Sequence, residues 1–173
     1  DNVKRLRSHP SIALWCGNNE MEDAWAYWGW KQSYNEKQQK EIYNSYKELF
    51  FNIIPSVVKE YDGTRFYWPS SPSSEFGRPS KQESGDLHYW GVWHGKEPFE
   101  NFQTKIGRFV SEYGFQSFPE FKTVQSYTTP EDWDIESEVM AAHQRSGIGN
   151  LRIRDYLNMY YKSPKDFTSF LYV

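Results

Sequence analysis

Short apolar and aromatic runs that alternate with longer helical stretches most limit what this chain can fold into. Residues 12–15, 64–68, 87–93 and 107–113 have the length and composition of strands and are bounded by turn-forming residues. Strands that alternate with helical connections are typical of βαβ units in a parallel sheet. The sequence therefore predicts an α/β fold.

The connections between these runs carry helical or loop patterns. Apolar residues recur at three- and four-residue spacing between positions 36 and 60, which predicts a helix that Pro55 should kink or restart. Shorter helices are predicted at 97–105, 135–145 and 152–161, and a last one is predicted to be capped by Ser163 with Pro164 at its first position. Residues 69–85, crowded with Ser, Pro and Gly, predict a long loop.

The number of strands fits part of a known architecture. An eight-stranded (β/α)8 TIM barrel typically needs about 250 residues, and this chain has 173 residues with four predicted strands. We therefore expect a partial TIM barrel, with about half of the barrel present.

Composition excludes several classes of function. The formal net charge of −3 argues against a nucleic-acid partner, which usually requires a concentrated basic face. No apolar run approaches the roughly 20 residues that span a bilayer, so we expect no membrane partner. The single cysteine, Cys16, leaves the redox compartment open. Aromatic residues make up 19% of the chain, which suits either a large aromatic core or a sugar-binding cleft.

Two of the predicted strands end in a glutamate. Glu20 follows residues 12–15 through the turn Gly17-Asn18-Asn19, and Glu112 lies near the end of residues 107–113. In a parallel α/β barrel the carboxyl ends of the strands face the active site, so both carboxylates would converge on one cleft. A solvated strand end is the ordinary alternative for either residue. A pair of carboxylates across a glycosidic bond is what glycoside hydrolysis requires.

The sequence around each glutamate resembles glycoside hydrolase family 2. Residues 9–20, HPSIALWCGNNE, are similar to the acid/base strand of that family, and their GNNE ending resembles its β-mannosidases in particular. Residues 108–117, RFVSEYGFQS, are similar to the nucleophile strand, and residues 86–90, DLHYW, lie between the two motifs. The resemblance implies that residues 1–173 are a fragment of the catalytic TIM-barrel domain, with barrel strands four to seven and the helices that follow them.

The resemblance also implies an activity and assigns roles. A retaining hydrolase of this kind cleaves terminal β-D-mannose from β-mannosides by double displacement, with Glu112 as nucleophile and Glu20 as acid/base. Asn19 resembles the residue that binds the sugar 2-hydroxyl, although Asn is also a common turn residue. The implied partners are a β-mannoside oligosaccharide and the remaining domains of the parent polypeptide.

Further cleft residues are proposed from position. His88 and Trp90 share side-chain parity on the predicted strand 87–93, so both would line the cleft if that face points inward; core packing is the alternative. Trp28, in the segment after the acid/base motif, is a candidate sugar platform or a member of a buried aromatic cluster. His88 and His94 are spaced like no common zinc motif, and we expect neither a metal nor another cofactor.

Three other interpretations remain open. A β-galactosidase or β-glucuronidase of the same family would share both carboxylates. A non-catalytic carbohydrate-binding module would use the aromatic residues without needing the glutamates. The isolated 173 residues are expected to be inactive in any case, because half a barrel leaves strand edges unpaired and the cleft without walls.

Overall fold

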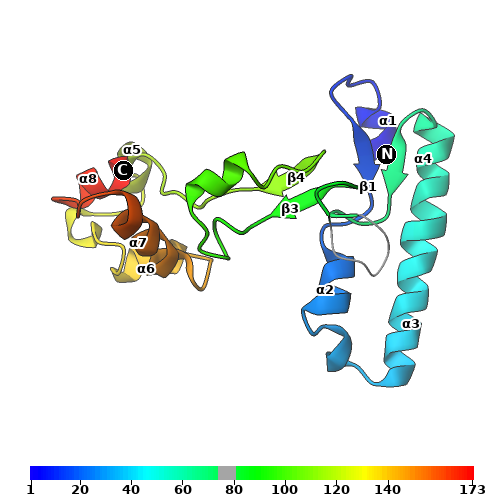
Figure 1. Cartoon of the computed structure of the whole chain (residues 1–173), viewed down its shortest axis with the longest axis horizontal. Coiled ribbons are helices and arrows are strands. Elements are labelled where there is room, and N and C mark those ends of the chain that lie inside the picture. Colours follow the sequence, from blue (N-terminus) through cyan, green and yellow to red (C-terminus); the bar gives the residue numbers. More distant parts are fainter. Residues whose placement is uncertain (74–80) are drawn as a thin grey trace. The chain divides into compact units, whose positions relative to one another are not determined.

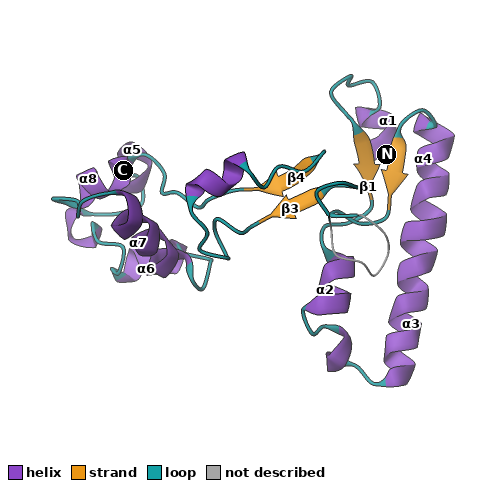
Figure 2. Cartoon of the chain, viewed as in Figure 1, coloured by secondary structure: helices purple, strands orange, loops and turns teal. Residues whose placement is uncertain are grey.

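The structure is a computed structural model that describes residues 1–73 and 81–173. The chain divides into two units, Asp1–His88 with Lys105–Glu112, and Tyr89–Thr104 with Tyr113–Val173. The described strands, orange in Figure 2, form two two-stranded sheets, and the remaining regular elements are helical. In the ranges that the structure describes, no helix has both the length and the apolar character needed to cross a membrane.

The first unit contains a βαβ unit. Helix α1 (Asn2–Leu6) precedes strand β1 (Leu14–Cys16), and helix α2 (Met21–Tyr27) and a 3-10 turn (Lys31–Ser33) follow it. A long helical segment then leads to strand β2 (Phe66–Trp68), which pairs in parallel with β1. The register places Leu14 opposite Phe66 and Cys16 opposite Trp68. The parallel pairing predicted from the alternation of elements is therefore present.

The long helical segment has three parts that run on as one rod in Figure 1. Helix α3 (Glu36–Lys47) begins at a capping box in which Asn35 and Gln38 exchange hydrogen bonds. It continues through a π-helix (Glu48–Ile53) into helix α4 (Ile54–Asp62), with Pro55 in the first turn of α4. A proline inside an α-helix clashes with the carbonyl four residues earlier, and the wider π turn relieves that clash. Pro55 thus starts a new segment, as predicted.

A buried polar network joins the start of the unit to the end of α4. The Asp62 carboxylate accepts hydrogen bonds from Trp15 Nε1 at 2.8 Å and pairs with Arg65 at 2.7 Å. The Arg65 guanidinium also donates to the backbone carbonyls of Arg7, His9 and Ile12. These donors lower the pKa of Asp62, first through the Trp15 hydrogen bond. The network therefore fixes the segment that leads into β1.

Strands β3 (Leu87–Tyr89) and β4 (Val110–Tyr113) form a second two-stranded sheet. The Leu87 amide donates to the Phe109 carbonyl at 2.9 Å. All four predicted strand segments thus contain a strand. The strand predicted at 87–93 ends early, because the chain turns at residues 90–95, where the His94 amide donates to the Trp90 carbonyl. Trp90 lies beyond the strand, so the parity argument that grouped it with His88 is wrong.

The second unit has an aromatic core. Phe115 packs edge-on against Trp93, Phe99 and Tyr156, with ring centroids 4.8–5.1 Å apart. Around this core lie a 3-10 helix (Phe99–Gln103), a 3-10 turn (Pro130–Asp132) and four helices: α5 (Phe121–Gln125), α6 (Glu138–His143), α7 (Gly149–Tyr160) and α8 (Phe167–Tyr172). The predicted cap of the last helix is wrong: Asp166, not Ser163, accepts from the Ser169 amide, at 2.7 Å.

The Asp62 network gives a pH-dependent prediction. A carboxyl whose folded-state pKa lies below its ordinary value of 3.8 stabilises the fold above that pH, and the contribution disappears as the pH falls through the folded-state pKa. Asp62→Asn should therefore lower the melting temperature of the intact protein at pH 7, and the gap to wild type should narrow below pH 3.8. Thermal unfolding followed by circular dichroism measures both. The exposed neighbour Glu60→Gln should change neither, and a gap independent of pH would contradict the assignment.

Candidate active site

The turn between β1 and α2 begins at a glycine that has no room for a side chain. A Cβ on Gly17 would lie 2.5 Å from both the Pro69 carbonyl oxygen and the Tyr67 hydroxyl, and 2.8 Å from Phe50. Contacts below 3.0 Å to a backbone atom cannot be relieved by a rotamer change. This close approach brings residues 17–20 against the chain that follows β2.

The Asn18 side chain stabilises the turn through four hydrogen bonds. Its amide nitrogen donates to the Pro69 carbonyl at 2.7 Å and to the Tyr46 hydroxyl at 3.2 Å. Its side-chain oxygen accepts from the Ser70 hydroxyl at 2.8 Å and from the Met21 amide at 3.2 Å. Ser70 is completely buried, so it has little access to water as an alternative partner.

The backbone of Glu20 is held in an unusual conformation. Its φ of 57° and ψ of 11° lie in the left-handed region, which costs a residue with a side chain about 1–2 kcal/mol. The Glu20 amide donates to the Ser71 carbonyl at 2.7 Å, and its own carbonyl accepts from Ala24 at the start of α2. The Ser71 amide in turn donates to the Asn18 carbonyl. These bonds carry the parallel pairing of β1 and β2 beyond the strands, and they hold Glu20 where its side chain points across the site.

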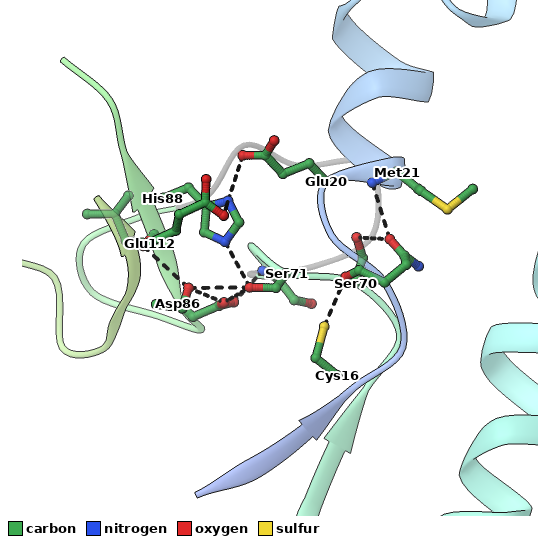
Figure 3. Close-up of polar contacts among 12 residues, drawn as sticks. Cys16, Glu20, Met21, Ser70, Ser71, Asp86, His88 and Glu112 are labelled. Atoms are coloured by element: carbon green, nitrogen blue, oxygen red, sulfur yellow. Dashed lines mark hydrogen bonds and ion pairs between the residues drawn. The ribbon is translucent and has the colours of Figure 1, made fainter. Parts of the chain in front are cut away.

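His88 lies between the two glutamates (Figure 3). Its Nδ1 is 2.7 Å from Glu20 Oε1 and 3.4 Å from Glu112 Oε2. The His88 side chain is 5% exposed, whereas those of Glu20 and Glu112 are 19% and 32% exposed. The structure therefore brings together Glu20 from the start of α2, His88 from β3 and Glu112 from β4, with the imidazole buried and the carboxylates more exposed.

A buried aspartate lies behind the histidine. Asp86 is 1% exposed and accepts from the Ser73 amide at 2.5 Å, from the Ser111 hydroxyl at 2.6 Å and from the Ser71 hydroxyl. The Ser71 oxygen is also 2.9 Å from His88 Nε2. A continuous chain of hydrogen bonds thus runs from Asp86 through Ser71 and His88 to Glu20, as the dashed lines of Figure 3 trace.

Acidic side chains of α2 lie near these hydrogen-bonded residues. Burial raises the pKa of Asp23, and the nearby charge of Glu20 raises it further while His88 opposes the shift. Burial likewise raises the pKa of Glu22, although a hydrogen bond from the Tyr46 hydroxyl at 3.0 Å partly offsets it. The pKa of Tyr46 is raised in turn, mainly by burial. Burial is thus the main cause of the raised pKa values of these three neighbours of the site.

The spacing of the three central residues bears on metal binding. One ligand atom each from Glu20, His88 and Glu112 lies within 4.8 Å of the other two, which is the set of groups that could accept an ion. Two ligand atoms each about 2.0–2.1 Å from a tetrahedral zinc ion would be roughly 3.4 Å apart. The 2.7 Å between His88 Nδ1 and Glu20 Oε1 is shorter, and it fits a shared proton.

The other predicted site residues have different surroundings. Asn19 is exposed and bridges Ser71 through its backbone. Trp28 ends α2 and is 55% exposed. Trp90 belongs to the second unit, where its ring is 5.5 Å from that of His94. A pocket of about 340 Å³ next to the turn is lined by other aromatic residues, among them Trp25, Trp30, Tyr34, Tyr43 and Tyr46.

Sequence reasoning missed Asn18, Ser71 and Asp86. Asp86 opens the DLHYW segment and Ser111 precedes Glu112, so both stood next to a motif. Ser71 lies in the loop predicted at 69–85, part of which, residues 74–80, is outside the described residues. Its position depends on the register of β1 and β2, which no local pattern specifies.

Comparisons with known proteins agree with the two motifs. The chain is 33% identical to β-mannosidase B of Aspergillus fumigatus over 177 residues, covering 99% of this chain and 21% of that protein. It is 34% identical to β-mannosidase B of Aspergillus clavatus over 178 residues, with the same coverage. No family model matches the sequence. The chain thus spans about a fifth of the length of these relatives.

Comparison with solved structures also finds similarity to a β-mannosidase. The β-D-mannosidase of Dictyoglomus thermophilum superposes on 98% of this chain and 20% of its own, with a TM-score of 0.79 and 37% sequence identity. The mixed helix and strand arrangement is therefore shared with part of a β-mannosidase. The resemblance to β-mannosidases inferred from the residues around Glu20 and Glu112 is confirmed.

The Asn18 contacts give a stability prediction. Asn18→Ala should leave the buried Ser70 hydroxyl and the Pro69 carbonyl without their partner, and an unsatisfied buried group costs about 1–3 kcal/mol. We expect the free energy of unfolding of the intact protein to fall by about 2 kcal/mol, measured by urea denaturation. Asn52→Ala, which removes an exposed hydrogen bond to Glu48, should stay within about 0.5 kcal/mol of wild type. Equal effects of the two changes would contradict the role of Asn18.

Proposed function

We propose that this chain carries the catalytic carboxylates of a retaining β-mannosidase, which releases terminal β-D-mannose through a covalent glycosyl-enzyme intermediate. The observation that carries the proposal is the approach of Glu20 and Glu112 to one another around His88, with one oxygen of each within 4.8 Å. Retaining hydrolases place their carboxyl groups about 5–5.5 Å apart, whereas inverting ones leave about 6.5–9.5 Å for a water molecule. The short separation supports double displacement.

The roles follow from the chemistry of that mechanism. In the first step a Glu112 oxygen attacks C1 while Glu20 gives its proton to the departing glycosidic oxygen. In the second step water attacks C1, its proton passes to Glu20, and Glu112 leaves as a carboxylate. Glu20 must therefore hold a proton in the free enzyme and lose it once Glu112 is esterified. Its contact with His88 Nδ1 at 2.7 Å supports that alternation, because a proton can lie between the two groups.

The β-mannoside specificity rests on the relatives and on Asn19. The similar proteins are named β-mannosidases, and Asn19 directly precedes the proposed acid. We propose that the Asn19 side chain binds the 2-hydroxyl, which is axial in mannose. His88, Trp28 and Trp90 are proposed to complete the binding of the sugar. The aglycone would extend toward aromatic residues that follow the acid, as platforms for sugar rings.

We also propose that the 173 residues are barrel strands four to seven of a catalytic TIM barrel. The parallel βαβ unit and the carboxylates at the ends of β1 and β4 support this arrangement. Phe66 in β2 is 81% exposed, although an aromatic strand residue of a closed barrel is normally covered by neighbours. The remaining domains of the parent polypeptide would cover such faces, and the isolated chain is expected to be inactive.

Trapping tests the nucleophile. An activated 2-deoxy-2-fluoro-β-mannoside slows both steps but allows the first, so the intact protein should accumulate a sugar ester on Glu112, identified by peptide mass mapping. Glu112→Ala should lose about 10⁴-fold or more in turnover and take no label. The exposed Glu60→Ala should label as wild type does, and the isolated 173 residues should not label. A label on another residue of an active protein would refute the assignment.

A substrate panel tests the sugar. The intact protein should prefer 4-nitrophenyl β-mannoside to the corresponding galactoside and glucuronide. Asn19→Ala should lower kcat/KM for the mannoside about 100-fold, because contacts to the 2-hydroxyl strengthen in the transition state. The exposed Asn44→Ala on α3 should have no effect. Preference for galactoside or glucuronide would support the alternative enzymes of the same family, and sugar binding without turnover would support a carbohydrate-binding module.

A further inference from the structure

The positions of the hydrogen atoms in the hydrogen bonds that link Asp86, Ser71 and His88 follow from which groups can donate and which can accept. The Asp86 carboxylate accepts from the Ser73 amide, and the hydroxyls of Ser111 and Ser71 both donate to its Oδ2. A serine hydroxyl has one hydrogen atom, and that of Ser71 is used on Asp86. The Ser71 oxygen, 2.9 Å from His88 Nε2, must therefore accept. His88 Nε2 carries a hydrogen atom, and Nδ1 is the nitrogen that faces the glutamates.

The other side of the imidazole then requires one more proton. A lone pair on Nδ1 would repel a carboxylate oxygen at 2.7 Å, so a proton must lie between Nδ1 and Glu20 Oε1. It belongs either to an imidazolium beside a carboxylate or to a neutral imidazole beside a carboxylic acid. Both forms give Glu20, His88 and Glu112 together a charge of −1.

We propose that Asp86 and Ser71 are positioning residues that fix the tautomer of His88, and that the proton delivered to the leaving group is shared between His88 Nδ1 and Glu20. The inference rests on the proposed function and deepens it. Neither Asp86 nor Ser71 touches the reacting atoms; they act through the imidazole. A histidine in the other tautomer would present an N–H to Glu20 without needing a proton on either group, and Glu20 would then reach the substrate ionised.

The charge of the site stays constant through the reaction. When the proton moves to the glycosidic oxygen, the C1–O bond breaks and the C1 bond to Glu112 forms, so Glu20 gains the charge that Glu112 loses. When water attacks C1, one of its protons returns to the pair of Glu20 and His88, and Glu112 regains its charge. The three residues together hold a charge of −1 throughout, and in the glycosyl-enzyme the Nδ1 lone pair faces an ionised Glu20, which favours the return of a proton to the pair.

Among the residues that the structure describes, further charged groups lie near the pair. Asp23, on α2, interacts with Glu20, His88 and Asp86, and Glu112 faces Nδ1 from β4. All are acidic and would favour a bound proton when ionised. The tautomer itself depends on the Ser71 hydrogen bonds and not on these charges.

Leaving-group dependence separates a loss of acid positioning from a general loss of structure. Cleavage of phenyl β-mannoside requires protonation of a basic leaving group, whereas 2,4-dinitrophenolate leaves without it. In the intact protein, Ser71→Ala should lower kcat/KM for the phenyl mannoside by at least about 10-fold, since general acid catalysis contributes about 10²–10⁴-fold. The loss on the dinitrophenyl mannoside should stay below about 3-fold, well short of that contribution. The basic limb of the pH profile for the phenyl substrate should also move to lower pH.

Matched variants make the result specific. Ser71→Thr keeps the hydroxyl and should restore most of the phenyl activity. Asp86→Asn should show the same selectivity for leaving group as Ser71→Ala and provides a second variant if that protein folds poorly. Ser56→Ala, which removes an exposed hydroxyl that donates to Ile53 within the helical rod, should match wild type on both substrates. Chelation should change neither substrate's kinetics, and activation by a divalent ion would overturn the shared proton.

The outcomes separate the inference from the function on which it rests. Glu20→Ala should show the strongest selectivity for the activated leaving group. If Glu20→Ala shows no selectivity, or if the intact protein hydrolyses no mannoside, the proposed function fails. If Glu20→Ala behaves as expected while Ser71→Ala loses both substrates equally, or neither, the positioning role of Ser71 and Asp86 is overturned and the acid assignment stands.

Discussion

The candidate site depends on the pairing of two backbone segments beyond the ends of their strands. The Glu20 amide donates to the Ser71 carbonyl, and the Ser71 amide donates to the Asn18 carbonyl. Backbone amide bonds of this kind fix position with little dependence on side-chain rotamers. The Ser71 hydroxyl is also hydrogen-bonded to His88, whose other ring nitrogen contacts the Glu20 carboxylate. Ser71 therefore positions both the backbone of Glu20 and, through the imidazole, its carboxylate.

Burial gives this arrangement its electrostatic character. Asp86 and Ser70 are almost completely excluded from solvent, and buried polar groups are costly unless they are fully hydrogen-bonded. Two serine hydroxyls and the Ser73 amide donate to Asp86, so its carboxylate is stabilised by the dipoles of these groups. In the mechanism that we propose, such fixed dipoles would be preorganised around the charge on Glu20 and Glu112, and preorganisation of this kind is a major source of catalysis in enzymes.

The sequence predicted the parts of the molecule that local patterns specify. The four strand segments, the restart of the helix at Pro55 and the two motif glutamates all follow from periodicity, turn residues or a resemblance. Ser71 could not be found in this way, because its function arises from the register of β1 with β2, a contact across 50 residues of chain. Trp90 was predicted to lie in a strand over residues 87–93, but β3 ends at Tyr89 because the chain turns at residues 90–95.

The left-handed conformation of Glu20 has a mechanical consequence. Glu20 is the residue from which α2 begins, since its carbonyl accepts the first hydrogen bond of that helix from Ala24. Glu20 is therefore held by hydrogen bonds to the Ser71 carbonyl and from the Ala24 amide, and it does not lie at the free tip of a loop. A tilt of α2, whose residues Met21 and Trp25 line the adjacent aromatic pocket, would rotate the carboxylate directly. The proton transfer that we propose for Glu20 therefore depends on the rigidity of α2.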